Sequence, residues 1–229
     1  RTGRTARAAL APTRGFGDLI EIGRQDRPEL YALHPSKPEP VVPRELRFEI
    51  GQRSWPDPQR GPGHPLEVER PTRTELAALA RAIRRSGAQS IAICLLHSYA
   101  EPEIERRVAR ALAPLGLPIT CSAELLREFR EFERFSTAAV NAVLVPVMRA
   151  SLGRLGAALG GARLELLQSS GGTLAAEIAA AEPVRVLFSG PAGGVVGAAR
   201  AARQAGFGAL VGLDMGGTST DVSFRAADG

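Results

Sequence analysis

The sequence predicts an α/β fold in which helices cover a sheet that contains parallel strands. Thr72 and Glu75 have the spacing of a capping box and precede an apolar stripe of helical period, which predicts a helix. The nearly continuous apolar run over residues 90–96 is typical of a strand that is buried on both faces. A helix from Pro102 and a short strand over residues 118–122 follow, and this β–α–β order favours parallel pairing.

The composition indicates a soluble protein with one or two domains. The chain has 229 residues, 44% of them hydrophobic, and no run approaches the roughly 18 apolar residues of a membrane span. Cys94 and Cys121 are the only cysteines and neither belongs to a CxxC motif, so we expect buried thiols, no disulfide, no zinc site and a cytoplasmic location. Residues 1–10 lack the apolar core of a signal peptide, and without an initiator Met we expect the natural chain to begin upstream.

The basic charge does not indicate a nucleic-acid-binding protein. The formal net charge is +5, and Lys37 is the only lysine, so 29 − 1 = 28 basic residues are arginines. Nucleic-acid binders cluster such charges and interleave them with aromatic residues. Here the arginines are spread singly and aromatic residues make up 5% of the chain, so we expect solvated charged faces and no nucleic-acid partner.

Proline content changes sharply once along the chain. Ten of the 17 prolines lie between Pro28 and Pro71, where long helices are therefore not expected. Alternation of apolar and charged residues predicts a half-buried strand over residues 45–50, with residues 66–70 as its partner in a small inserted hairpin. The Gly/Pro-rich connection over residues 51–65 is expected to be a mobile surface loop that tolerates insertions.

The longest helix is expected over residues 136–155, where apolar side chains recur at helical spacing. Pro146 falls inside this segment and removes one helical hydrogen bond, so we expect a kink there. Short strands are expected over residues 164–168 and 184–188. A further helix and a strand over residues 209–213 follow.

The turn after this last strand carries the strongest chemical signal. Asp214 ends the strand and Asp221 begins the next one. Between them lie two glycines and three hydroxyl residues: Gly216, Gly217, Thr218, Ser219 and Thr220. Successive N–H groups of such a turn form an anion-binding nest, glycine permits a positive φ and a close approach to a ligand, and hydroxyls donate to phosphate oxygens. Asp214 is placed to hold Mg²⁺, usually through water, and Asp221 to brace the hairpin or orient water.

A glycine-rich hairpin without a ligand is the alternative to a phosphate site. The order of acid, small turn, hydroxyl run and acid between two apolar strands is more specific than the glycines alone. We therefore favour phosphate binding by the intact protein, and we expect Gly217 to need a positive φ that a β-branched residue cannot readily adopt.

This strand–turn–strand segment resembles a phosphate hairpin of the actin-like ATPases. In that superfamily one such hairpin opens each of two related domains, and the second follows a helix at the domain interface. Residues 214–221 are similar to the second hairpin, and Ser189–Gln204 resembles the preceding helix. The resemblance implies an ATP and Mg²⁺ site, with both acids as catalytic candidates, Asp214 as the metal ligand, and Ser189 and Gly190 as further cofactor-binding candidates.

Seven segments that span nearly the whole chain resemble, in the same order, the hydantoinase A/5-oxoprolinase family. They include SGPAGGVVGA and LDMGGTSTDVS, and they lie at residues 13–25, 42–48, 94–99, 133–137, 168–172, 189–198 and 213–223. Members of this family use ATP to open a cyclic amide such as a hydantoin or 5-oxoproline. Relatives activate acetone or acetophenone for carboxylation.

The family resemblance implies a partial actin-like (ribonuclease H-like) ATPase fold with an inserted Pro-rich β-hairpin segment. Residues 1–122 would be the latter part of the family's N-terminal region, and residues 123–229 the start of its core. The implied partners are a small cyclic amide substrate and a hydantoinase B-like second subunit. Two alternatives stay open: a subunit of an acetone-carboxylase-like enzyme, and a non-catalytic nucleotide-binding module.

One departure from the family pattern concerns the other half of the ATP cleft. The first phosphate hairpin and the adenosine-binding half do not occur in these 229 residues. The segment therefore resembles an internal fragment, which we expect to bind ATP·Mg²⁺ weakly and to be inactive alone.

Three further features each have two interpretations. His97 follows a buried strand, where α/β folds place functional groups, although an imidazole satisfied by the backbone is the simpler interpretation. Arg24 could reach a ligand, or it could pair with Glu21 or Asp26. The polar turn over residues 169–172 could line the nucleotide cleft or be only a turn.

Overall fold

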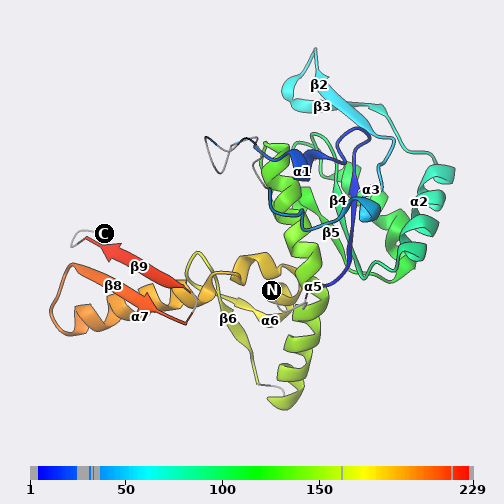
Figure 1. The fold of residues 1–229 in the computed structure, drawn as a ribbon. Coiled ribbons are helices and arrows are strands. Elements are labelled where there is room, and N and C mark those ends of the chain that lie inside the picture. Colours follow the sequence, from blue (N-terminus) through cyan, green and yellow to red (C-terminus); the bar gives the residue numbers. More distant parts are fainter. Residues whose placement is uncertain are drawn as a thin grey trace. The chain divides into compact units, whose positions relative to one another are not determined.

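The computed structural model describes residues 5–226 apart from residues 25–30, 32, 34–36, 161 and 218 (Figure 1). The chain forms two compact units, Arg1–Val147 and Met148–Gly229. It passes from the first unit into the second within one long helix, α5 (Glu131–Ala158).

A three-stranded parallel sheet forms the centre of the first unit. Its strands are β1 (Ala8–Pro12), β4 (Ser90–Cys94) and β5 (Ile119–Cys121), in the order β1-β4-β5. Every residue of β1 and β4 is buried. The parallel pairing, and the passage from β4 through α3 (Glu103–Leu112) to β5, confirm the predicted α/β fold.

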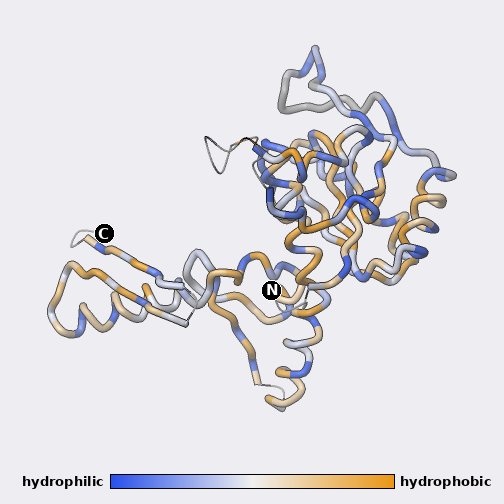
Figure 2. Tube along the Cα trace, in the orientation of Figure 1, coloured by the Kyte–Doolittle hydropathy of each residue, from blue (hydrophilic) through white to orange (hydrophobic). Residues whose placement is uncertain are grey.

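Alternate side chains of the central strands face two separate apolar cores. On β4, Ile91 and Ile93 pack with residues of α2 (Arg73–Ser86) and α3, whereas Ala92 and Cys94 pack with α5. Successive side chains of a strand point to opposite faces, so this unit has three layers: α2 with α3, the sheet, and α5. Figure 2 shows hydrophobic colouring over much of these strands.

Helix α2 begins and ends where the sequence predicts. Thr72 Oγ1 accepts a hydrogen bond from the N–H of Glu75 (3.2 Å), and Glu75 Oε2 accepts one from the N–H of Thr72 (2.8 Å), so both halves of the capping box form. Gly87 ends the helix with a φ of 70°. Other short helical turns in this unit are α1 (Leu19–Ile22), η2 (Ala113–Leu115) and α4 (Ser122–Leu125).

The Pro-rich segment contains a hairpin, but its strands differ from those expected. β2 (Arg53–Asp57) pairs antiparallel with β3 (Gly61–Glu69) around a turn at residues 58–60. The expectation of a mobile loop over residues 51–65 is therefore wrong, and Gln52 at its start is buried. Prolines fit here because a two-stranded ribbon leaves the outer N–H groups of both strands unpaired. Tolerance to insertion is now expected only at the turn.

Residues 45–50 pair with the central sheet rather than with residues 66–70. The 3₁₀ turn η1 (Arg44–Leu46) is followed by two isolated parallel bridges to β1 and to the residue after it. Ile50 and the partly buried Phe48 pack in the core with α2 and α3, as their alternation predicts. Leu46, in the 3₁₀ turn, is buried in the other core with α5, so the face predicted for Leu46 and the predicted partner strand are both wrong. Alternation of side chains indicates which face of an extended segment is buried. The strand that it pairs with depends on residues far away in the sequence.

Helix α5 continues through Pro146, and groups from other segments satisfy the carbonyls near it. A proline has no N–H for the carbonyl four residues earlier, which here is that of Ala142. Ser90 Oγ donates to Ala142 O at 2.6 Å, and the N–H of Ala6 donates to Val143 O at 2.9 Å. Ser90, at the start of β4, therefore replaces the hydrogen bond that Pro146 cannot give to Ala142 O. Ala6, which precedes β1, donates to the next carbonyl of the helix.

We expect Ser90→Ala to lower the free energy of unfolding by about 1–3 kcal/mol, because it leaves the buried carbonyl of Ala142 without a donor. Pro146→Ala restores a helical N–H and should make the same Ser90→Ala change cost less. Urea unfolding of the four proteins in a double-mutant cycle measures this coupling. Equal costs of Ser90→Ala in both backgrounds would contradict the assignment.

By length and composition alone, α5 could also cross a membrane. Its amino-terminal half, however, lies in the core of the first unit, where Phe135 and Ala138 are buried together with Arg134 and Asn141. Burial of this kind is typical of the core helix of a globular protein. The absence of a membrane partner stays a prediction.

In its described part, the second unit contains two antiparallel hairpins with helices between them. The elements are β6 (Glu165–Leu167), β7 (Thr173–Ala175), α6 (Ala176–Ala181), η3 (Pro183–Val186), α7 (Ser189–Gln204), β8 (Leu210–Met215) and β9 (Thr220–Arg225). β6 pairs with β7, and β8 pairs with β9. The helix expected before the last hairpin and the strand expected over residues 209–213 are thereby confirmed within one or two residues.

The strand expected over residues 184–188 is wrong. Pro183 opens the 3₁₀ helix η3 instead, and the N–H of Arg185 donates to Glu182 O at 3.1 Å. The ring of a proline fixes φ near the value that a helical turn needs. A short apolar run fits such a turn as well as a strand, so the local pattern could not separate them.

Candidate functional site

The predicted phosphate turn lies at the tip of the β8–β9 hairpin (Figure 1). Asp214 and Asp221 oppose each other in register, and the N–H of Gly216 donates to Ser219 O at 2.9 Å. Thr218 lies outside the described residues. The hairpin thus brings the two acids to the base of the glycine and hydroxyl turn, while their roles as ligands stay predictions.

The glycines of this turn differ from expectation in their backbone. Neither Gly216 nor Gly217 has a positive φ, so the left-handed φ expected at Gly217 is wrong. A Cβ added at Gly217 would meet no described atom within 4 Å. The fold therefore does not require glycine at this position, and the open space beside it leaves the backbone accessible to a ligand.

Asp214 and Asp221 form a like-charged pair across the hairpin. Directly opposed residues of antiparallel strands have Cβ atoms about 4.5–5.5 Å apart, where like charges are destabilising. A cation relieves this repulsion, and carboxylate oxygens are ligands that Mg²⁺ prefers. Among the described residues, no group of three or more His, Cys, Asp and Glu side chains could hold a metal ion. Magnesium binding at these two acids stays a prediction.

Helix α7 brings a second anion-binding feature to the same end of the hairpin. Its 16 residues extend about 24 Å, and the six residues of β8 extend about 20 Å. β8 contacts the helix and runs back along it after a short connection (Figure 1). The end of β8 thus returns toward Ser189 and Gly190, where the free N–H groups of the first turn and the helix dipole favour an anion.

The polar turn over residues 169–172 joins the start of α7. It connects β6 to β7, and Ser169 Oγ accepts a hydrogen bond from the N–H of Phe188 at 2.9 Å. The N–H of Ser169 donates to Arg185 O at 2.8 Å. These contacts place the turn beside the start of α7, because Phe188 directly precedes that helix, while its part in a nucleotide cleft stays a prediction.

A buried ionic network that the sequence did not predict lies at the carboxyl edge of the first unit's sheet. Glu105 of α3 is fully buried, and its Oε1 accepts hydrogen bonds from Leu95 N (2.8 Å), Ser98 Oγ (2.8 Å) and Ser122 Oγ (2.7 Å). Its Oε2 accepts one from Ala123 N at 3.0 Å. This one carboxylate therefore ties the ends of β4 and β5 to α3.

Arg134 of α5 extends this network and is also fully buried. Its guanidinium donates to Leu95 O (2.8 Å), Ser122 Oγ (3.1 Å) and Glu128 O (3.0 Å), and it forms an ion pair with Glu131. The network thus links α3, the ends of two strands and α5.

The Glu105 network holds the fold together rather than offering free groups to a substrate. Burial raises the pKa of the Glu105 carboxyl, while its hydrogen bonds from the backbone and from Ser122 and Ser98 lower it. The polar atoms of Glu105 and Arg134 are engaged in hydrogen bonds, and Glu131 Oε2, which is buried without a hydrogen-bond partner, is compensated by its ion pair with Arg134. The only signal in the sequence was a charged residue beside Ile104 on the apolar face of α3.

His97 follows β4 and has an unusual backbone, with a φ of 59°. Its N–H donates to Glu131 Oε1 at 2.9 Å, and its ring packs edge-on against Tyr99 with centroids 6.2 Å apart. Burial lowers the pKa of the His97 imidazole, so the neutral form is favoured at pH 7.

Arg24 pairs with a residue from a distant part of the sequence. Its Nε lies 3.0 Å from Glu133 Oε1, at the start of α5. The expected pairing with Glu21 is wrong, because Glu21 accepts from Arg47 at 2.8 Å, and Asp26 lies outside the described residues. The structure thus favours the ion-pair interpretation of Arg24.

Comparison with known proteins decides the family. The hydantoinase/oxoprolinase N-terminal region matches residues 1–116, and the hydantoinase/oxoprolinase region matches residues 134–228. The chain belongs to the hydantoinase/oxoprolinase family. The expected boundary between these regions, at residues 122 and 123, stays a prediction.

Two relatives of this hydantoinase/oxoprolinase chain are named as enzymes. The 5-oxoprolinase of Saccharomyces cerevisiae is 31% identical over 248 residues, which cover 97% of this chain and 19% of the relative. Caprolactamase subunit alpha of Pseudomonas jessenii is 31% identical over 229 residues, which cover 95% of this chain and 31% of the relative. The chain therefore spans about a fifth to a third of the length of these relatives.

Solved structures of two such enzymes share the fold of this hydantoinase/oxoprolinase chain. Nucleotide-free acetone carboxylase, an ATP-dependent enzyme, superposes with a TM-score of 0.80 at 27% identity, over 97% of this chain and 33% of that one. The ATP-dependent caprolactamase also gives 0.80, at 29% identity, over 96% of this chain and 32% of that one. These similarities confirm the family resemblance seen in the sequence.

Proposed function

We propose that this chain is part of an ATP-dependent enzyme that opens a cyclic amide, such as 5-oxoproline, a hydantoin or a lactam. The observation that carries the proposal is the β8–β9 hairpin, whose strand β8 contacts α7 and runs back toward the start of that helix. The names of the oxoprolinase and caprolactamase relatives support the reaction class.

The proposed reaction activates the amide carbonyl by phosphorylation. The amide oxygen attacks the terminal phosphorus of ATP and ADP leaves. Water then adds to the activated carbon, the ring C–N bond breaks, and a second water releases phosphate from the resulting acyl phosphate. Such phosphoryl transfer depends mainly on positioning and charge neutralisation.

In this scheme each residue of the site has a distinct task. The backbone of Gly216 and Gly217 and the neighbouring hydroxyls hold phosphate oxygens, and Ser189 and Gly190 add N–H donors from α7. Asp214 would hold Mg²⁺, which neutralises phosphate charge when bound. Asp221 braces the hairpin opposite it or orients the attacking water.

The same proposal includes a larger assembly around this chain. Val211, Leu213, Val222 and Phe224 on the β8–β9 hairpin are 65–74% exposed, as expected for strands that further protein covers. We propose an actin-like arrangement of the complete enzyme and a second, hydantoinase B-like subunit, which the name of caprolactamase subunit alpha supports. A cytoplasmic location and the absence of a nucleic-acid partner stay predictions.

A carboxylase is the second candidate function, because acetone carboxylase shares the fold. Such an enzyme would use the same phosphate site to phosphorylate the enol oxygen of a ketone. The activated ketone would then be carboxylated with carbon from bicarbonate. The two candidates differ in substrate and product rather than in the geometry of the described residues.

Substrate-stimulated ATP hydrolysis by the full-length protein, with any partner subunit, tests the proposal. We expect one of 5-oxoproline, hydantoin or caprolactam to stimulate phosphate release and to yield its ring-opened acid. Stimulation by acetone with bicarbonate, and by no cyclic amide, would favour the carboxylase. Nucleotide binding without stimulation by any of these compounds would favour a non-catalytic nucleotide-binding module.

A further inference from the structure

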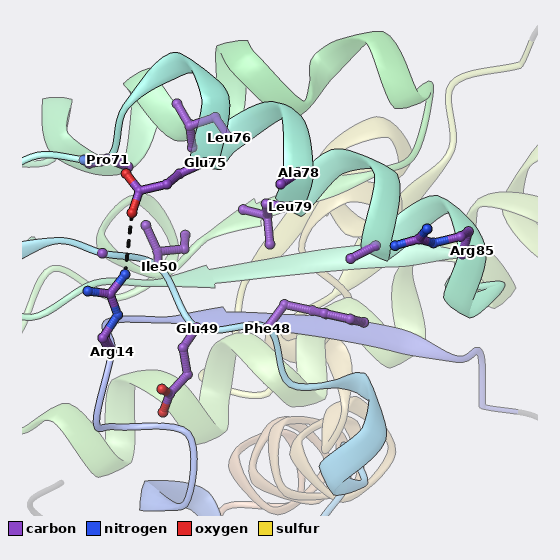
Figure 3. Close-up of a pocket in the computed structure, with 12 residues that line it drawn as sticks. Arg14, Phe48, Glu49, Ile50, Pro71, Glu75, Leu76, Ala78, Leu79 and Arg85 are labelled. Atoms are coloured by element: carbon purple, nitrogen blue, oxygen red, sulfur yellow. Dashed lines mark hydrogen bonds and ion pairs between the residues drawn. The ribbon is translucent and has the colours of Figure 1, made fainter.

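A pocket of about 450 Å³ lies in the first unit, remote in sequence from the phosphate hairpin. It lies between α2 and residues 48–51, which run beside the central sheet (Figure 3). Phe48, Ile50, Leu76 and Leu79 give it an apolar lining. This volume and lining are in the usual range for a small-molecule site.

Two arginines stand at opposite ends of this pocket. Figure 3 shows Arg14 near Glu75 at one end and Arg85 at the other, with Leu79 and Ile50 between them. The lining part of α2 extends from Glu75 to Arg85, and ten helical residues span about 15 Å. The pocket is therefore an elongated groove with a cation at each end.

The charges at the Arg14 end are already neutralised. Arg14 Nη1 lies 3.3 Å from Glu69 Oε1, and Arg14 Nη2 lies 3.4 Å from Glu75 Oε1. Glu75 also caps α2, and Glu49 points away from α2 in Figure 3, where its Oε1 accepts hydrogen bonds from two backbone N–H groups at 3.0 and 3.1 Å. None of these carboxylates is left to neutralise Arg85.

Arg85 is the uncompensated charge of the pocket. Among the described residues no carboxylate lies within ion-pair distance of its guanidinium, whereas several other arginines of this unit are paired. A free guanidinium beside an apolar groove matches a ligand with a carboxylate at one end and an apolar tail.

Gly51 lies directly beside the Arg14–Glu75 pair at one end of the groove. A Cβ at Gly51 would lie 2.6 Å from Arg14 Nη2 and 3.1 Å from Glu75 Oε1. A side chain at residue 51 would therefore have to displace the ends of the Arg14 and Glu75 side chains that meet there. Because Arg14 is already paired with Glu69 and Glu75, a ligand's carboxylate is expected at the other end, at Arg85.

We propose that this groove binds a small monocarboxylate with an unbranched apolar tail. The carboxylate pairs with Arg85, and the tail lies along Leu79 and Ile50 toward Arg14. This site is distinct from the phosphate hairpin, so the proposal does not depend on the proposed function.

Titration of the full-length protein with acetate, butyrate, hexanoate and octanoate tests the apolar half of the proposal. We expect the affinity to rise about tenfold for each two added methylene groups until the groove is filled. Hexanol and hexylamine, which lack the carboxylate, should bind far more weakly than hexanoate. Equal binding of these three compounds, or no calorimetric signal with any of the acids, would overturn the proposal.

Arg85→Gln and its neighbour Arg84→Gln form a matched pair that tests the charged half. Both residues are exposed and lie in the last turn of α2, but only Arg85 lines the groove. We expect Arg85→Gln to weaken hexanoate binding about tenfold, as loss of a charge-assisted pair does, and Arg84→Gln to leave it unchanged. Circular dichroism checks the fold, and equal affinities of two folded variants would show that the acid binds elsewhere.

Discussion

Asp214→Asn is expected to reduce substrate-dependent ATP hydrolysis by the full-length protein about 100-fold or more, while the fold survives. Asparagine keeps the size and the hydrogen-bonding shape of aspartate but removes the charge that the metal needs. The residue is exposed at the end of β8, so its replacement disturbs little packing. It also relieves the repulsion between Asp214 and Asp221 in the apoprotein, so stability should not fall.

Gly217→Val separates phosphate binding from metal-assisted chemistry. Because a Cβ at this position meets no described atom, the variant should fold normally and lose affinity for the nucleotide itself. Asp214→Asn should instead affect turnover more than binding. Phosphate release, nucleotide affinity and circular dichroism should be measured for both variants. Near-native hydrolysis by folded Asp214→Asn would rule out the assigned site and the mechanism built on it.

Arg134→Leu should lower the free energy of unfolding by about 3–5 kcal/mol. The substitution removes the charged partner of Glu131 and the donor to Leu95 O, all in the buried network at the end of the sheet. Leucine cannot replace these hydrogen bonds, so polar groups stay buried without partners.

Arg149→Leu is the matched control for this substitution, because Arg149 lies on the same helix and is exposed. Its replacement should change the free energy of unfolding by less than about 0.5 kcal/mol. Urea denaturation of both variants gives the comparison. Similar small losses for the two would show that the Arg134 network contributes little to stability.

Local interactions decided the features that the sequence predicted well. The capping box of Thr72 and Glu75 spans three residues, and both of its hydrogen bonds form. The β8–β9 hairpin needs only a short turn and two adjacent apolar strands. The same short segments, in order, also revealed the family, since each motif is read from neighbouring residues.

The features that the sequence missed depend on segments that are far apart in the chain. Alternation is correct for Phe48 and Ile50 but not for Leu46, and the partner of this segment depends on the path that returns it to β1. Most of the Gly/Pro-rich stretch over residues 51–65 is strand rather than the expected loop. The hydrogen bonds between β2 and β3 hold it extended, and composition alone does not reveal that pairing. Residues 184–188 were expected to form a strand, but Pro183 opens a 3₁₀ helix there. A short apolar run is compatible with either structure.

The sequence by itself determined the α/β class, the family and the β8–β9 hairpin in which it predicts a phosphate turn, because each is encoded in short continuous patterns. Only the tertiary structure placed β8 along α7 and buried Glu105 against the ends of two strands. It also left Arg85 without an ion-pair partner among the described residues, at the end of an apolar groove. The physical reason is that burial and ion pairing depend on which distant groups meet, and alternation and turn chemistry do not specify those partners.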